Sequence, residues 1–467
     1  MGLFEEEEKH NEQESMVLFG EKHEQLNLIG LFKVEKEHEK RDSTVMSEEE
    51  HDKLDSMGLF EKEEEHNEML VYCIINVKTL LQTLAAFNSM DIESDDPTED
   101  HFDSDHLAAS LPSEIIIEIL IKLPVKSLLQ FMCVCRSWCA LISNPIFVKK
   151  HLRAVTEDEN YEHHRLITKS FCADVEWSSL LSVLREESPI GTHALDYPMK
   201  HPCDWVGLIG SLNGLVCISI DQSFIFLWNP STRISKRLLH SNTTHHRRQD
   251  VRYGFGYDEG SSEYKVVYIY TVFNYLEFSF DTNVKIYGLK SDSWKTVENY
   301  PKCYTMSTMG VFVSGSLHWD SDIKSGINNY HSIISLDLSK ETFSVISSPC
   351  SRQEGNLNLK IGVLGGCLAL FSNFVGKKID VWVMKEHGKI ESWSKLFSLP
   401  TLYVPIFCFC STPLCISKRN EVFLVNGPHL VVYNLETKTV RHSLIDKFYY
   451  VLEAVTYCES LVTPFPE

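Results

Sequence analysis

The feature that most constrains the fold is a β-rich unit that recurs along the second half of the chain. Short runs of Val, Ile, Tyr, Phe and Trp, separated by Gly, Ser, Asn and Asp turns, fill residues 165–467. Each unit couples a leading strand to a later pair of strands joined by a polar turn. Successive units start about 44 to 56 residues apart, the length of a four-stranded propeller blade. The starts are Gly210, Gly254, Gly310, Gly362 and Pro413.

A further unit at residues 165–202 would bring the number of blades to about six. Closure of the blades into a ring removes exposed strand edges. The last β run, Tyr449 to Leu461, is placed to complete the first blade. The sequence therefore predicts an all-β, propeller-like domain over residues 165–467. A sandwich or an open stack of sheets is the alternative fold.

A helical segment precedes the β units, between Leu111 and about Leu152. In LPSEIIIEILIKLP the apolar residues fall at helical spacing, with Glu and Lys off the stripe. Pro124 ends this helix and opens a second, and a third apolar stripe ends near Asn144-Pro145. The pattern predicts three short helices whose core is too small to stand alone. They either dock onto a partner surface or cap the following domain.

This segment closely resembles the F-box, the motif by which adaptor subunits of SCF ubiquitin ligases hold the Skp1 protein. The Leu-Pro start, LPVKSLL, CVCRSW and the Asn-Pro stop carry the resemblance, which implies an F-box over residues 106–155. Large apolar side chains are the expected anchors, although some of them must form the small core instead. The residues expected to contact Skp1 are Leu111, Pro112, Ile116, Leu120, Leu123, Pro124, Leu128, Val134, Cys135 and Trp138.

The β domain resembles the F-box-associated region of plant F-box proteins, including relatives of the S-locus F-box and F-box/kelch-repeat proteins. NGLVCI, LWNPSTR, YGFGYD, YKVV, GSLHW, GVLGGCL, DVWVMKE and SWSKLF carry this resemblance over Gly210 to Tyr457. True kelch repeats place a double glycine in every blade, whereas only Gly365-Gly366 occurs here. The resemblance implies a domain whose loops select a target protein, and it does not identify that target.

The first 105 residues differ in character from the rest of the chain. MGLFEEEEKHNE at the start returns as MGLFEKEEEHNE at Met57 to Glu68, and the formal net charge of −21 arises in this region. Such acidic repeats bury too little apolar surface to fold, so we expect a disordered extension and linker over residues 1–105. Neither this region nor the near-neutral remainder concentrates Lys and Arg, which excludes nucleic acid as an expected partner.

The apolar run from Met69 to Phe87 includes Asn76, Lys78 and Gln82 and is too short and polar to span a membrane. No secretory signal opens the chain, because Glu5 to Glu8 stand where such a signal is basic and then apolar. We therefore expect a cytoplasmic or nuclear protein with reduced cysteines and no membrane partner.

No catalytic motif is present: the chain lacks the nucleophile elbow, the zinc helix, the phosphate loop and the dinucleotide turn. The cysteine spacing at Cys133, Cys135 and Cys139 does not build a tetrahedral metal site. We expect no cofactor, no metal and no enzymatic activity. The resemblances imply a substrate-recognition subunit that reaches cullin and RING subunits through Skp1. The alternative is a propeller-type binding scaffold without a ubiquitin role.

Overall fold

The computed structural model divides the chain into two units, residues 1–110 and residues 111–467. The acidic repeats and the apolar run from Met69 to Phe87 lie outside the described residues, and the predictions about them stay predictions. The structure describes residues 113–158, 161–170, 175–185, 191–200, 205–221, 224–238, 248–274, 279–301, 304–305, 309–325, 328–350, 357–374, 378–400, 412–417, 420–426, 429–444 and 451–466.

Four helices follow one another between Ser113 and Thr156, one more than the sequence pattern predicts. The Asn144 side chain accepts a hydrogen bond from the Ile146 amide at 2.8 Å, and Pro145 occupies the first turn. The predicted end of the third helix near Asn144-Pro145 is confirmed, since that helix ends at Ile142. The predicted number of helices is wrong, because the same pair begins a fourth helix. The four are α4 (Ser113–Ile121), α5 (Val125–Met132), α6 (Arg136–Ile142) and α7 (Pro145–Thr156).

Side chains from the four helices share one small core, and we call this part of the chain the helical unit. The α-helices of the described residues are these four and the short α8 (Leu180–Arg185). None of them is long and apolar enough to cross a membrane. The buried residues of the helical unit are Leu120, Val125, Leu128, Phe131, Ile142, Phe147, His151 and Val155.

The rest of the described chain forms six separate sheets, each antiparallel, as the repeat spacing predicts. The sandwich alternative is excluded, because each blade pairs its own strands and no strand belongs to two sheets. The first blade consists of β25 (Val451–Cys458), β1 (His164–Ser170), β2 (Val175–Ser179) and β3 (His193–Ala194). The second consists of β4 (Val206–Leu212), β5 (Leu215–Ile220), β6 (Phe224–Asn229) and β7 (Ile234–Leu238).

The remaining four blades repeat this arrangement. The third consists of β8 (Arg248–Asp258), β9 (Glu263–Asn274), β10 (Ser279–Gly288) and β11 (Ser293–Val297). The fourth consists of β12 (Tyr304–Thr305), β13 (Val311–Val313), β14 (Ser316–Ser325), β15 (Asn328–Asp337) and β16 (Thr342–Ser347). The fifth consists of β17 (Leu357–Leu364), β18 (Cys367–Phe374), β19 (Lys378–Met384) and β20 (Trp393–Pro400). The sixth consists of β21 (Thr412–Ile416), β22 (Glu421–Asn426), β23 (His429–Asn434) and β24 (Val440–Leu444).

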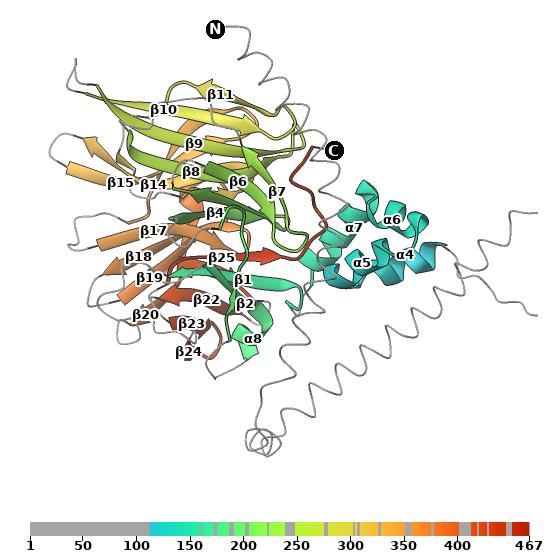
Figure 1. The fold of residues 1–467 in the computed structure, drawn as a ribbon. Coiled ribbons are helices and arrows are strands. Elements are labelled where there is room, and N and C mark those ends of the chain that lie inside the picture. The colour runs from blue at the N-terminus through green and yellow to red at the C-terminus, as the bar shows by residue number, and fades with distance from the viewer. Residues whose placement is uncertain are drawn as a thin grey trace, which may run out of the picture. The chain divides into compact units, whose positions relative to one another are not determined.

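The blades close into a ring. Their inner strands contact one another in the order β25, β4, β8, β13, β17, β21 and back to β25. The C-terminal strand β25 pairs with β1, from His164 opposite Cys458 to Ser170 opposite Val451, and Figure 1 shows the two side by side. The predicted completion of the first blade by the last β run is confirmed. Closure pairs strand edges that an open stack leaves exposed.

Two ends of the ring follow from this pairing. Because β1 begins opposite Cys458, the chain from the helical unit joins the propeller where the inner strands end. We call this the linker end. At the opposite, far end the inner strands begin, for example at Val206 of β4.

Several turns at the linker end share one side-chain-to-backbone hydrogen-bond pattern. An Asp or Asn side chain accepts a backbone hydrogen bond from the residue two positions ahead, and the residue four positions ahead adopts a positive φ. Three of these turns join the last two strands of a blade, and the fourth joins β8 to β9. The pairs are Asn229 and Arg233, Asp258 and Ser262, Asp337 and Glu341, and Asn434 and Lys438.

Candidate functional site

The helical unit exposes large apolar side chains at its surface. On α4, Ile115 and Ile119 are 46% and 43% exposed, and their spacing of four residues places them on one side of the helix. Val134, between α5 and α6, is 45% exposed. Ile146, at the start of α7, is 68% exposed. Exposed apolar groups on so small a module are typical of a surface that another protein covers.

The residues predicted to contact Skp1 divide into four groups. Leu120 and Leu128 are buried, with 1% and 0% of their surface exposed, so they hold the helical unit together in this structure. Val134 is exposed, while Leu111 and Pro112 lie outside the described residues. Partner contact by the set stays a prediction. The half-buried members are Ile116, Leu123, Pro124, Cys135 and Trp138.

Sequence reasoning left Ile115 and Ile119 out of the predicted set, although both belong to the apolar stripe of the first helix. A nine-residue helix that carries Ile at five positions has more apolar surface than its one inward face buries. This excess of apolar residues was the sequence signal that could have identified Ile115 and Ile119 as exposed. We call Ile115, Ile119 and Val134, with the half-buried Leu123 and Trp138, the apolar face.

Two residues of the apolar face, Leu123 and Trp138, are held in place by contacts with buried residues. Nε2 of the fully buried His151, on α7, lies 3.0 Å from the carbonyl oxygen of Leu123 and donates a hydrogen bond to it. The pKa of His151 is lowered by burial, which keeps the imidazole neutral. The Trp138 ring meets buried Phe131 edge-to-face, with ring centroids 5.7 Å apart. Helix α7 thus supports the α4–α5 corner.

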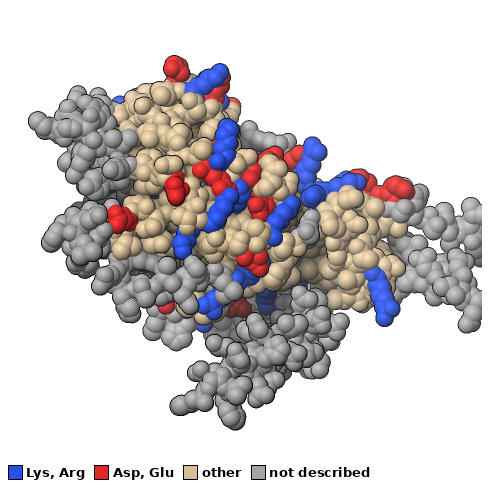
Figure 2. All heavy atoms as spheres, turned by 90° about the horizontal axis from the view of Figure 1, so that it is seen from above, with Lys and Arg blue, Asp and Glu red and all other residues tan. Residues whose placement is uncertain are grey.

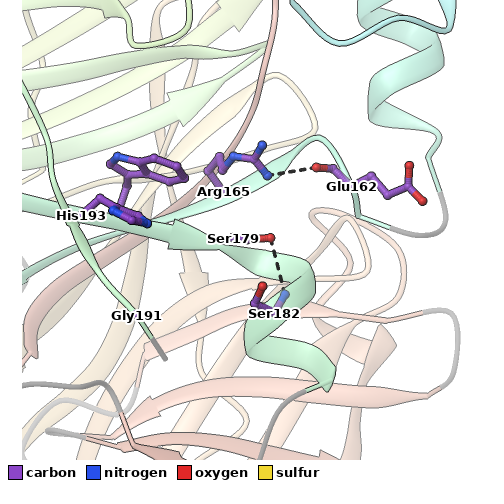
Figure 3. Close-up of a pocket in the computed structure, with 7 residues that line it drawn as sticks. Glu162, Arg165, Ser179, Ser182, Gly191 and His193 are labelled. Carbon is purple, nitrogen blue, oxygen red and sulfur yellow. Dashed lines mark hydrogen bonds between the residues drawn. The ribbon is translucent and has the colours of Figure 1, made fainter. Parts of the chain in front are cut away.

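The propeller carries a pocket of about 420 Å³ in its first blade, beside α8 (Figure 3). The Arg165 guanidinium crosses its upper side in this view, donates to the Glu162 carbonyl at 2.9 Å and pairs with Glu459 at 3.1 Å. Because Glu459 already balances the charge of Arg165, the pocket has little attraction for an anion. Its lining is Glu162, Arg165, Trp177, Ser179, Ser182, Gly191 and His193.

The polar groups of this pocket serve the local structure. Ser179 Oγ accepts a long hydrogen bond from the Ser182 amide at 3.5 Å at the start of α8. The His193 ring lies against Trp177, with ring centroids 4.9 Å apart and the ring planes tilted by 34°. This geometry does not form a Ser–His pair of the kind that activates a nucleophile. Within the described ranges, no group of three or more His, Cys, Asp or Glu residues is arranged to hold a metal ion.

Charged side chains on the described surface are mixed in sign. Figure 2 shows Lys and Arg next to Asp and Glu on the face turned to the viewer. Lys236 pairs with Asp292 at 2.9 Å, and Lys340 pairs with Asp337 at 3.2 Å. Paired charges of this kind leave little free positive charge for a phosphate backbone.

Two polar clusters join neighbouring blades. Lys265 Nζ lies 2.9 Å from Asp258 and 3.0 Å from Glu341, which stands in the turn of the next blade. His318 Nε2 lies 2.9 Å from Nε2 of His387, which also belongs to the next blade. Burial, followed by the nearby His387, lowers the pKa of His318 to about 4. Both clusters bridge blades, which indicates a structural role.

Comparison with known proteins gives two family matches. Residues 109–150 match the F-box domain, and residues 203–463, more than half of the chain, match the F-box associated beta propeller domain. Of Arabidopsis thaliana proteins, the F-box/kelch-repeat protein At3g23880 is 31% identical over 375 residues, which cover 76% of this chain and 96% of the relative. The F-box protein CPR1 is 31% identical over 356 residues, covering 71% of this chain and 83% of the relative.

The F-box match covers α4 to α6 and the first half of α7, and the propeller match covers the second to the sixth blade and β25. An F-box together with a propeller domain points to a substrate-recognition adaptor. The chain belongs to the plant F-box proteins that carry an F-box associated β-propeller domain.

Proposed function

We propose that this protein is the substrate-recognition subunit of an SCF-type E3 ubiquitin ligase, with the helical unit docked on Skp1 and the propeller holding a target protein. The family supports a substrate-adaptor role in general. The observation that carries the finer proposal is the apolar face, where Ile115, Ile119 and Val134 are exposed. At about 25 cal/mol per Å² of apolar area, covering three such side chains supplies several kcal/mol of binding.

In this proposal the chain makes and breaks no bond. Cullin and RING subunits, reached through Skp1, bring the charged ubiquitin-conjugating enzyme, while this subunit raises the effective concentration of target lysines beside it. Degradation of the target follows from ubiquitin transfer.

The far end of the propeller is the part we assign to target recognition. At the linker end several turns contain only two residues, such as Asn213-Gly214 and Ser314-Gly315. Strands β7 and β20 end at the far end, and β8 and β21 begin there, so the chain passes from one blade to the next at this end. Loops on a rigid scaffold are where proteins place binding residues.

Co-purification with Skp1 tests the docking face. We expect Ile115→Asp/Ile119→Asp to abolish recovery of Skp1, because two charges replace exposed apolar contacts without disturbing the buried core. Leu123→Ala/Pro124→Ala tests the corner between α4 and α5 in the same way. Val345→Asp is a matched control, since Val345 is 43% exposed on β16 of the propeller.

Equal recovery of Skp1 with Ile115→Asp/Ile119→Asp and with wild type would refute the assigned face. Binding of Skp1 does not by itself distinguish the ligase from a scaffold. A reconstituted ubiquitin-transfer assay with a bound target does so, because a scaffold holds its target without modifying it.

A further inference from the structure

The chain continues beyond its last strand. After β25, residues 459–465 cross from the first blade to the second at the linker end of the ring, and we call this segment the strap. Figure 1 shows it in dark red, running from β25 toward the chain end marked C. Two motifs that carry the family resemblance, NGLVCI and LWNPSTR, supply residues that hold it.

Buried hydrogen bonds attach the strap to the second blade. The side-chain amide of Asn229, which is fully buried, donates to the carbonyls of Ser460 at 2.9 Å and Val462 at 2.8 Å. The Ser460 hydroxyl, in a residue that is also fully buried, donates to the Asn213 carbonyl at 3.0 Å. Gly214 has a φ of +80°, and a Cβ atom there would lie 2.1 Å from Ser460 Oγ. The close approach of the strap therefore requires glycine at this turn.

Apolar and charged contacts extend this attachment toward the third blade. Val462 packs against the core that the second and third blades share. The Lys236 ammonium lies 5.8 Å from the ring centroid of Phe465, and it pairs with Asp292 of the third blade at 2.9 Å. The strap thus has several anchors on the ring that do not involve the helical unit.

The first residue of the strap, Glu459, holds the linker that leads to the helical unit. Its amide donates to the His163 carbonyl at 2.8 Å, and its carboxylate pairs with Arg165 at 3.1 Å. The other carboxylate oxygen lies 4.0 Å from His163 Nδ1. Only 20% of the Glu459 side chain is exposed, so salt and water screen these contacts less than they screen a surface pair.

The same corner reaches helix α7. Burial raises the pKa of the Cys458 thiol, and a hydrogen bond with the side chain of Thr156, the last residue of α7, opposes this rise. Burial lowers the pKa of His151, also on α7, and the negative charge of Glu459 acts against this shift. Contacts with α7 and with the linker therefore converge on Cys458 and Glu459.

We propose that the strap fixes the helical unit relative to the ring, with Glu459 as the positioning residue. Residues 157–163 join α7 to β1 and would act as a hinge if the strap did not hold them. The inference rests on the proposed function for its consequence: a fixed joint presents a restricted set of lysines to the ubiquitin-conjugating enzyme. A free hinge would spread the effective concentration over many lysines and select none.

The test measures the distance between two spin labels in the full chain by pulsed electron–electron double resonance. One label is placed on α6 at Ala140 and the other on the fourth blade at Ser339, both exposed, through a non-natural amino acid that spares the native cysteines. We expect one narrow distance distribution in the wild type and its loss in Glu459→Ala. Arg165→Glu/Glu459→Arg should restore the narrow distribution, because the exchanged pair recovers the attraction.

Two further variants separate the strap from the local ion pair. Gly214→Ala displaces Ser460 and leaves Glu459 in the chain, so it should broaden the distribution as well. Glu386→Ala is the matched control, since Glu386 is 62% exposed and pairs with Lys389 within its own turn, and the distribution should stay narrow. Thermal unfolding of each variant shows whether the ring is intact.

A distribution in Glu459→Ala that matches the wild type would overturn the proposal, and so would a broad distribution in the wild type. The distances need neither Skp1 nor a target, so failure of the proposed function is a separate result. In a reconstituted ligase the chain's own lysines serve as the acceptor. Glu459→Ala should then spread ubiquitin over more of these lysines, with recovery of Skp1 unchanged. An unchanged set of modified lysines would refute the consequence for the ligase.

Discussion

His151 of α7 donates a hydrogen bond of 3.0 Å to the carbonyl oxygen of Leu123, across 28 residues of sequence. Leu123 lies at the corner between α4 and α5, in the apolar face. Because His151 is fully buried, no water replaces a lost donor there. We expect His151→Phe to destabilise the helical unit by about 1 to 3 kcal/mol, the cost of leaving a buried carbonyl unsatisfied.

Hydrogen exchange of the α4 and α5 amides measures this change within the intact chain. His151→Gln is the control, because its amide retains a donor, and it should protect these amides better than His151→Phe does. Equal exchange in both variants would show that the hydrogen bond contributes nothing and that ring packing on Phe147 decides the stability.

Leu128 and Ile119 should respond in opposite ways to truncation. Leu128 is fully buried, so Leu128→Ala leaves a cavity and should cost about 2 to 5 kcal/mol of unfolding free energy. Ile119 is 43% exposed, so Ile119→Ala should change the unfolding free energy by less than about 1 kcal/mol. The same substitution should weaken the binding of Skp1. Urea unfolding followed by circular dichroism, together with Skp1 titration, separates the effects. A stable Leu128→Ala variant would contradict the core assignment.

The six-bladed ring could be predicted from the sequence because its signals are local and repeated. The spacing of units such as those at Gly210 and Gly254 indicates the blade length. Polar turns, such as those at Asn229 and Asn434, mark where one strand ends and its antiparallel neighbour begins. Ring closure follows, since an unpaired β1 edge requires the final β run.

Exposure is what the sequence could not specify. Trp205 and Trp228 both stand among strand-forming residues, yet Trp228 is 2% exposed and Trp205 is 43% exposed. The difference depends on neighbours from distant segments, such as Met309 and Lys169. Likewise the sequence indicates that a helix ends near Asn144-Pro145, but it did not show that the same pair also begins α7.

Acid should weaken the contact between the fourth and fifth blades. The pKa of His318 is lowered from 6.5 to about 4, by burial and then by the charge of His387. The unfolded chain therefore binds protons before the native His318 does, so stability is complete above about pH 6.5 and falls as pH decreases toward about 4. The pKa of His387 is lowered as well, which adds to the effect.

Urea unfolding midpoints measured across this pH range test the His318 prediction. His318→Gln removes the titrating ring and should flatten this part of the profile relative to wild type. An identical pH profile in both proteins would contradict the assignment. His151 and His164 also have lowered pKa values, so only the difference between the two profiles is informative.

Lys265 should be needed to hold the third and fourth blades together. Its ammonium contacts Asp258, Glu341 and the Leu338 carbonyl within 3.0 Å, and Lys265 and Asp258 are both buried. Lys265→Met leaves the carboxylates without their cation and should cost about 3 to 5 kcal/mol of unfolding free energy. Lys340→Met is the matched control: Lys340 is 76% exposed and pairs with Asp337 in the same turn, so its loss should cost less than about 1 kcal/mol.

The same variant changes the response to acid. Burial by itself would raise the pKa of Asp258, but hydrogen bonds from Lys265, Ser261 and the Gly260 amide lower it to about 2, against an ordinary 3.8. The stability linked to Asp258 is therefore present above about pH 3.8 and lost as pH falls toward about 2. Without Lys265 the pKa of Asp258 rises and lies closer to its value in the unfolded chain, so Lys265→Met should lose less stability than wild type as pH falls from about 3.8 toward about 2. If Lys265→Met and Lys340→Met unfold at the same urea concentration at neutral and at acid pH, the buried cluster does not join the blades.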